Sequence, residues 1–178
     1  MKILNNKFKN ELNIRTEKDF PTKGIEFIDI TPLFLQKETL NEMKELFLIE
    51  LKDKEIDYIV GPEARGFLLG AMLATSLNAG FIPVRKKGKL PPTTVLSVAN
   101  YTKEYGDDVL ELPKLVNEDY KGKNFYLVDD IYATGNTLNA LKKEIINLGG
   151  NVVGEGVIIN IKELNNDKVF SLIEINEE

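Results

Sequence analysis

Two adjacent carboxylates, Asp129 and Asp130, precede a turn of small and hydroxylated residues in the segment FYLVDDIYATGNT. The N–H groups and the dipole at a helix start favour a phosphate, and the hydroxyls of Thr134 and Thr137 add donors. Because ionised carboxylates only accept hydrogen bonds, the acid pair suits a diol rather than the phosphate. The segment therefore predicts a site for a ribose 5-phosphate. The alternative to a binding site is a solvent-exposed acidic turn followed by an ordinary helix cap.

A second charged group is basic and follows the strand-like run at 81–84. It comprises Arg85, Lys86, Lys87 and Lys89, four cations within five positions. Charge runs usually mark solvated faces. A single local cluster is nevertheless sufficient to bind a small anionic ligand.

The common nucleotide-binding signatures are absent from the sequence. The segment 61–66 has the Gly-x4-Gly spacing of a P-loop, but Phe67 and Leu68 follow where Lys and Ser/Thr are required. No G-x-G-x-x-G occurs. ATP cleavage at a Walker site and dinucleotide redox chemistry therefore lose support.

The composition of the 178-residue chain excludes further reaction classes. The chain has no histidine and no cysteine, so a Ser-His-Asp triad, a thiolate nucleophile, a disulfide framework and the usual Cys/His zinc site are excluded. Proton transfer must then use Glu, Asp, Lys, Tyr, a backbone group or water. A metal should be a hard, oxygen-ligated ion such as Mg²⁺.

Net charge and apolar runs bear on partners and location. The formal charge is −5, from 23 Lys+Arg and 28 Asp+Glu, which argues against sequence-independent binding to nucleic acid. The N-terminal segment has no apolar run of signal-peptide length, and the most apolar window, 67–84, is interrupted by polar residues. We expect a cytoplasmic protein that binds small molecules, with neither nucleic acid nor membrane as a partner.

Strand-like and helical patterns alternate along the chain. Apolar runs typical of buried strands occur at 56–60, 81–84, 125–128, 152–159 and 169–175, and helical patterns at 40–51, 67–79 and 137–148. The alternation predicts one α/β domain over 1–178, with a mostly parallel twisted sheet flanked by helices. Ligands of such sheets bind beyond the carboxyl ends of the strands, which selects the loops 61–66, 85–89 and 129–137.

A long stretch between Gly88 and Gly122 has no clear helical period. It contains strand-like pieces at 93–98 and 109–112, joined around residues 105–107. Long irregular insertions in compact domains are usually functional or disordered. We therefore predict a mobile hairpin over 95–112.

The string VDDIYATGNT resembles the phosphoribosyl-pyrophosphate (PRPP) motif of type I phosphoribosyltransferases. Four further blocks resemble, in order, those of the adenine phosphoribosyltransferase family: DFPTKGIEFIDITPLF (19–34), GPEARGFLLGAMLA (61–74), GFIPVRKKGKLP (80–91) and YTKEYGDDVLEL (101–112). The resemblance covers roughly residues 19–160. It implies the type I phosphoribosyltransferase fold, with an N-terminal helix and hood segment over 1–34 and a catalytic hairpin over 95–112.

The resemblance also implies a reaction: ribose 5-phosphate passes from PRPP to adenine, giving AMP and pyrophosphate. Mg²⁺ would be held through PRPP or pyrophosphate rather than directly by side chains, and the enzyme would be a homodimer whose basic segment can reach the neighbouring site. By position, the resemblance assigns the ribose hydroxyls to Asp129 and Asp130, the 5-phosphate to Ala133, Thr134, Gly135, Asn136 and Thr137, the pyrophosphate to Arg65, Arg85, Lys86 and Lys89, and adenine to Phe27, Ile131 and the backbones of Glu26 and Ile28.

The resemblance places the general acid/base for the purine at Glu104, beside Tyr105 in the hairpin. On residue type alone, Asp107, Asp108 and Glu111 compete for that role. A carboxyl group is a natural proton carrier here because the chain has no histidine. Closure of the hairpin would exclude water from a reactive sugar cation.

Two residues depart from the family pattern. Asn136 replaces a usual glycine, and Asn tolerates left-handed backbone better than most residues. Ile28 replaces a usual basic residue, which lowers affinity if that cation acts by charge and changes little if only the backbone touches the base. Two other functions stay open: transfer to xanthine, hypoxanthine or guanine, and non-catalytic regulation by PRPP binding. The second would usually require a DNA-binding extension, for which roughly eighteen residues before the first block leave little room.

Overall fold

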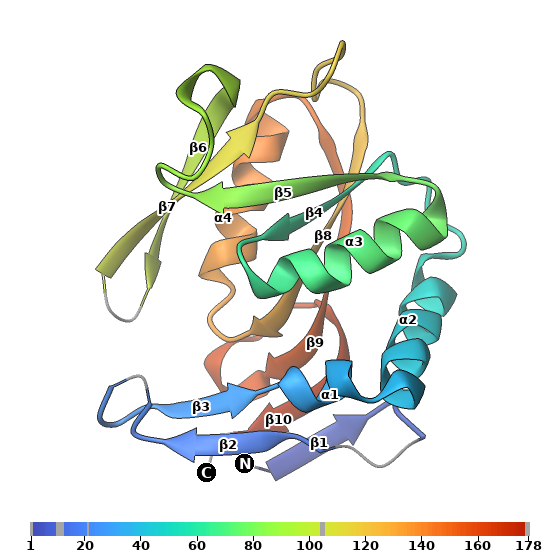
Figure 1. The fold of residues 1–178 in the computed structure, drawn as a ribbon, viewed down its shortest axis with the longest axis vertical. Helices are drawn as coiled ribbons and strands as arrows, with labels where there is room; N and C mark the ends of the chain where they lie inside the picture. The colour runs from blue at the N-terminus through green and yellow to red at the C-terminus, as the bar shows by residue number, and fades with distance from the viewer. Residues whose placement is uncertain (1, 10–12, 21, 104–105, 177–178) are drawn as a thin grey trace.

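Eight strands form the main sheet of the computed structural model, which describes residues 2–9, 13–20, 22–103 and 106–176. The strands are β1 (Lys2–Asn6), β4 (Tyr58–Pro62), β5 (Gly80–Lys86), β6 (Val95–Lys103), β7 (Gly106–Pro113), β8 (Asn124–Tyr132), β9 (Asn151–Ile161) and β10 (Phe170–Asn176). Their order is β1-β10-β9-β8-β4-β5-β7-β6 (Figure 1). The central strands, from β10 to β5, run parallel, and antiparallel strands flank them at both edges. The predicted mostly parallel sheet is confirmed.

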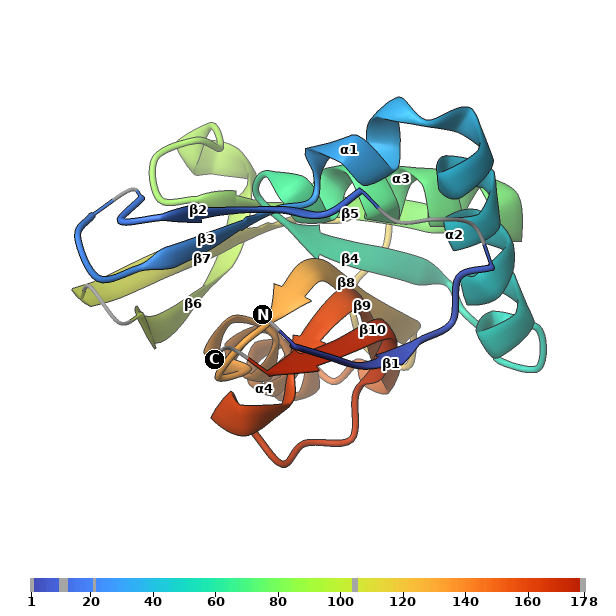
Figure 2. The same ribbon diagram turned by 90° about the horizontal axis from the view of Figure 1, so that it is seen from below.

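Helices cover both faces of the sheet. They are α2 (Lys37–Leu51) and α3 (Arg65–Leu77) on one face and α4 (Asn136–Asn147) on the other (Figure 2). On α4 the buried residues Leu138, Leu141 and Ile145 recur every three or four positions, which puts them in one stripe facing the sheet. Burying each such side chain contributes about 1.5–3 kcal/mol. The three predicted helices are thus confirmed, with bounds shifted by a few residues.

Glycines let α3 approach the sheet closely. A Cβ at Gly61 would lie 2.5 Å from the carbonyl oxygen of Gly66, and one at Gly70 would collide with the ring of Phe81. Side chains at these positions would therefore push the helix off β4 and β5. The Gly-x4-Gly spacing of 61–66 serves this close packing of strand against helix.

The N-terminal region differs from the prediction of a helix within 1–34. Its described residues form β1, the separate antiparallel pair β2 (Arg15–Lys18) and β3 (Glu26–Asp29), and one short helix, α1 (Thr31–Leu35). β1 pairs antiparallel with β10, so it gains backbone hydrogen bonds at a sheet edge that a helix would leave open. The β2–β3 pair is the part of the predicted hood that lies beside α1 (Figure 1).

The insertion after β5 contains a short 3-10 turn, η1 (Pro92–Thr94), and a hairpin of β6 and β7. The register runs from the pair of Val95 and Pro113 to the pair of Lys103 and Gly106. β7 also pairs with β5, which joins the hairpin to the main sheet. The predicted hairpin is thus confirmed in its two strands, while its mobility stays a prediction. In the part of the chain that the structure describes, no helix is long and apolar enough to cross a membrane.

Candidate active site

The acid pair lies near the carboxyl end of β8. The strand is buried as far as Val128, and Asp129 is half-buried, while the side chain of Asp130 is only 6% exposed. Asp129 Oδ1 accepts a hydrogen bond from the backbone N–H of Asp130 at 2.9 Å. A Cβ at Gly66 would lie 3.2 Å from the same oxygen, so the start of α3 closes against the acid pair.

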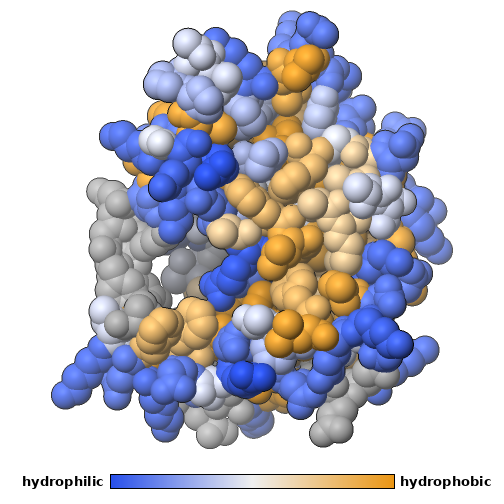
Figure 3. All heavy atoms as spheres, in the orientation of Figure 1, coloured by the Kyte–Doolittle hydropathy of each residue, from blue (hydrophilic) through white to orange (hydrophobic). Residues whose placement is uncertain are grey.

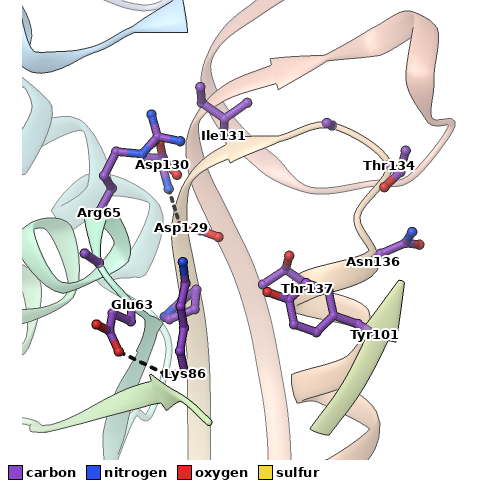
Figure 4. A pocket seen from close by; sticks show the side chains of 13 residues that line it. Glu63, Arg65, Lys86, Tyr101, Asp129, Asp130, Ile131, Thr134, Asn136 and Thr137 are labelled. Atoms are coloured by element: carbon purple, nitrogen blue, oxygen red, sulfur yellow. Dashed lines mark hydrogen bonds and ion pairs between the residues drawn. The ribbon is translucent and has the colours of Figure 1, made fainter. Parts of the chain in front are cut away.

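Arg65 joins the acid pair to the N-terminal hood. Its Nε lies 2.8 Å from Asp130 Oδ2, and its guanidinium carbon lies 5.4 Å from the centre of the Phe27 ring. Figure 4 shows Arg65 and Asp130 pointing toward one another from α3 and β8. A cation over an aromatic face is attracted by the ring quadrupole. The guanidinium therefore contacts a carboxylate and an aromatic ring at once.

The phosphate turn follows β8 and leads into α4. Gly135 has a φ of +77°, and a Cβ there would collide with the ring of Tyr132. Asn136 is the first residue of α4, so the left-handed position is Gly135 and not Asn136. Turn and helix start line a hollow of about 90 Å³. Backbone N–H groups at such a helix start form an anion site.

The basic segment is held by two buried or half-buried glutamates. Glu63 Oε2 accepts from Arg85 Nε at 2.9 Å and from the backbone N–H of Lys86 at 3.0 Å. These bonds, that from Arg85 above all, lower the pKa of Glu63. Glu111 accepts from the backbone N–H of Gly88 at 2.9 Å. Because Glu111 is only 8% exposed and shapes this loop, it is a poor candidate for the proton carrier.

These loops meet around a cleft of about 530 Å³. Figure 4 shows Lys86 reaching into it from β5 toward the end of β8. The cleft is lined by Pro62, Glu63, Ala64, Arg65, Lys86, Tyr101, Asp129, Asp130, Ile131, Ala133, Thr134, Asn136 and Thr137. Cations, carboxylates and the phosphate turn, predicted from three separate loops, thus face one space.

Some predicted site residues stand apart from this lining. Arg85 pairs with Glu63, Lys89 lies on the exposed part of the basic segment, and Glu26 and Phe27 belong to the hood strand β3. The side chain of Ile28 is 5% exposed and packs in the core, so only its backbone is available to a ligand. Glu104 and Tyr105 lie outside the described residues, and their predicted roles stay predictions.

Several residues that line the cleft, among them Glu63 and Tyr101, have no role predicted from the sequence. Tyr101, on β6, is 8% exposed and its hydroxyl donates to Asp108 Oδ2 at 3.1 Å. Both residues lie inside the family-like blocks 61–74 and 101–112. That position in the blocks was the available signal for them.

The electrostatics of the acid pair lead to a stability prediction. Burial first, and then the carboxylate of Asp130, raise the pKa of Asp129 well above its ordinary value of 3.8. The folded state therefore binds this proton more tightly than the unfolded state does. As the pH rises from the ordinary pKa to the raised one, the unfolded state loses this proton first, so the free energy of unfolding falls over that interval and stays lowered above it.

Asp129→Asn should therefore raise Tm at neutral pH, by about 3 °C, while impairing function. The amide removes the charge, yet its oxygen can still accept the hydrogen bond that Asp130 N–H donates. Thermal unfolding from about pH 4 to about pH 8 measures the effect. The gain should shrink as the pH falls toward 3.8, where Asp129 is increasingly protonated in both states. A gain independent of pH, or a loss at neutral pH, would contradict the assigned cause.

Comparison with known proteins agrees with this geometry. A family model described as "Phosphoribosyl transferase domain" matches residues 34–177. Adenine phosphoribosyltransferase of Clostridium tetani is 45% identical over 151 residues, covering 85% of this chain and 86% of the relative. That of Brachyspira hyodysenteriae is 44% identical over 165 residues, covering 92% and 94%.

Solved structures give the same answer. Adenine phosphoribosyltransferase from Thermoanaerobacter pseudethanolicus has a TM-score of 0.82 and 39% identity, covering 91% of this chain and 95% of its own. The Saccharomyces cerevisiae enzyme, complexed with adenine and an imino-altritol bisphosphate, has a TM-score of 0.75 and 38% identity, covering 89% and 93%. With its parallel sheet, acid pair and phosphate turn, the chain belongs to the adenine phosphoribosyltransferase family of type I phosphoribosyltransferases.

Proposed function

We propose that this enzyme transfers ribose 5-phosphate from PRPP to adenine, giving AMP and pyrophosphate. The observation that carries the proposal is the cleft, because it presents an acid pair, a helix-start phosphate turn and cations to one space. A ribose 5-phosphate with a pyrophosphate at C1 offers a complementary group to each of them: a diol to the acid pair, the 5-phosphate to the turn and the pyrophosphate to the cations. The family relatives named for this activity support the choice of adenine.

In the proposed mechanism the phosphate turn binds the 5-phosphate, and Asp129 and Asp130 accept hydrogen bonds from the ribose hydroxyls. When PRPP binds, the guanidinium of Arg65 must leave the carboxylate of Asp130 and contact the substrate instead. The C1–O bond to pyrophosphate breaks, a bond from C1 to adenine N9 forms, and N9 loses its proton. Positive charge developing on the sugar is stabilised by the carboxylates, and the leaving pyrophosphate by Lys86 and Arg65. Arg85 and Lys89 complete the proposed basic segment.

The proposed adenine site lies between the hood and β8. Phe27 would contribute an aromatic face, and Ile131, which lines the cleft, an apolar one. Glu26 and Ile28 would contribute backbone groups. Since the Ile28 side chain is buried in the core, its departure from the family pattern should have little effect on the base.

Mg²⁺ is part of the proposal. The described residues contain no group of three or more acidic, His or Cys side chains that would form a protein cage for an ion. Mg²⁺ prefers oxygen ligands, and phosphate oxygens of PRPP or pyrophosphate together with water would supply them, rather than side chains directly. When bound, the ion neutralises charge on the leaving pyrophosphate.

Glu104 is the proposed carrier of the purine proton, with Tyr105 beside it. Asp108 already accepts hydrogen bonds from the hydroxyl of Tyr101 and from the backbone N–H of Val109. Glu111 accepts one from the backbone N–H of Gly88 in the basic segment. Glu104→Gln should lower kcat by about a hundredfold while KM for PRPP changes little. Steady-state kinetics with varied PRPP measure both constants, and an unchanged kcat would remove Glu104 from the mechanism.

A steady-state assay with PRPP, Mg²⁺ and a panel of bases tests the substrate. We expect kcat/KM for adenine to exceed that for hypoxanthine, guanine and xanthine by at least about a hundredfold, since a site that pairs with one set of base edges leaves polar groups unpaired with another. Preference for an oxopurine would replace adenine with that base. Binding of PRPP without turnover of any base would favour a regulator instead.

We also propose that the enzyme is a homodimer and that it is located in the cytoplasm. Figure 3 shows apolar side chains gathered over α3. Leu35, Ile49 and Leu68, from α1, α2 and α3, are 73%, 65% and 55% exposed. Extended apolar patches often mark interfaces. Light scattering should give twice the chain mass of 20.1 kDa, and a monomer at enzyme concentrations would contradict this part.

A further inference from the structure

The segment that follows β9 touches the phosphate turn from outside the cleft. It begins with η2 (Lys162–Leu164) and leads into Asn165. The amide nitrogen of Asn165 lies 2.8 Å from the carbonyl oxygen of Ala133, 2.9 Å from Asn160 Oδ1 and 3.0 Å from the carbonyl oxygen of Ile161. One side-chain amide thus joins the phosphate turn to the end of β9.

A second contact holds the same turn one residue earlier. The hydroxyl of Tyr132 donates to Asp167 Oδ2 at 2.7 Å and accepts from Asn139 Nδ2 at 3.4 Å. Burial, and then the bond to Asp167, raise the pKa of Tyr132, so its hydroxyl stays a donor at neutral pH. Asn165 Oδ1 accepts from the backbone N–H of Asp167 at 3.2 Å, which connects the two contacts.

These contacts act on the backbone of the site and not on its ligand. The described residues that line the cleft include Ala133 but neither Asn165 nor Asp167. The orientation of the Ala133 carbonyl is tied to that of the next N–H through the planar peptide bond. A change in that carbonyl therefore turns the N–H of Thr134, which lies in the phosphate turn.

We propose that Asn165 is a positioning residue, which sets the affinity for the 5-phosphate of PRPP by fixing the Ala133 carbonyl. The inference rests on the proposed function, since it concerns the same phosphate turn. Asn165 lies 32 residues from Ala133 in the chain and would act only through it. Substitution of Asn165 should therefore weaken the binding of phosphate-bearing ligands and leave the binding of adenine unchanged.

Asn165→Asp tests this proposal at nearly unchanged size. It replaces the donor with an oxygen that faces three oxygen acceptors. Asn166→Asp is the matched control, because it adds the same charge one residue away at an exposed position. We expect Asn165→Asp to raise KM for PRPP and Kd for AMP by about tenfold. KM for adenine should stay within about twofold, and Asn166→Asp should change neither KM by more than that.

Each other outcome has a definite meaning. Equal KM values for PRPP in the two variants, or a parallel rise for PRPP and adenine, would overturn the proposal, because a general loss of structure would not single out the phosphate. If Asn165→Asp does not fold, Asn165→Ala removes the donor without adding charge, and a smaller rise in KM for PRPP alone is expected. If the native chain does not turn over adenine, the proposed function fails separately. Calorimetric titration with ribose 5-phosphate then still compares the variants.

Discussion

Asp130→Asn is expected to lower kcat/KM for PRPP by about a thousandfold, the largest effect of any conservative change in the cleft. The carboxylate is 6% exposed, pairs with Arg65 and is proposed to receive a ribose hydroxyl. An amide cannot offer a full negative charge to either group, and charge-assisted hydrogen bonds are about twice as strong as neutral ones. Loss of the charge also removes stabilisation of the sugar cation, so kcat should fall as well as kcat/KM.

Asp53→Asn is the matched control for that experiment. Its side chain is 88% exposed, is not among the described residues that line the cleft, and pairs only with the exposed Lys52 at 3.9 Å among described contacts. The same chemical change there should leave kcat and KM unchanged. If Asp130→Asn kept more than about a tenth of native kcat/KM, the acid pair would not be the ribose site we propose.

Gly135→Ala should reduce turnover by at least about a hundredfold. Two costs add at this position. A side chain at a φ of +77° costs about 1–2 kcal/mol, and the new Cβ would collide with the Tyr132 ring, which is 1% exposed and cannot move aside. Relief of the collision must displace the turn, so the N–H groups no longer converge on one phosphate.

Gly122→Ala separates these two costs. Gly122 has a φ of +74°, and no atom lies within 4 Å of the Cβ it would carry. Its thermal unfolding should show the backbone strain alone, with kinetics unchanged. Comparable activity in the two variants would mean that the phosphate turn tolerates displacement, contrary to its proposed role.

The site could be predicted where its parts are contiguous in the chain. Acid pair, phosphate turn and helix start fall within one stretch, 129–137, so residue types and spacing indicate both the elements and their chemistry. The strands and helices around them followed from hydrophobic periodicity, because each buries one face or stripe. The resemblance to a family then supplied the substrate, which no local pattern specifies.

The parts that join distant segments could not be predicted in this way. Glu63 and Arg85 are 22 residues apart, and Asn165 and Ala133 are 32 apart. Each pair meets only because strands become neighbours in the sheet, and a single polar residue carries no periodic signal. The N-terminal strand β1 could not be predicted for the same reason, since the residues 2–6 gain their hydrogen bonds from β10, at the other end of the chain.

The pairing of β5 with β7 connects two functions that the sequence presents as separate. Arg85 lies opposite Glu111 and Lys86 opposite Leu110, and the N–H of Lys87 donates to the carbonyl of Val109 at 3.0 Å. The base of the hairpin and the basic segment therefore share one set of hydrogen bonds, so a shift of that base would also move the cations. For a hairpin that opens at this base, opening and release of pyrophosphate should be a single kinetic event, and the rate of product departure should depend on the hydrogen bonds between β5 and β7.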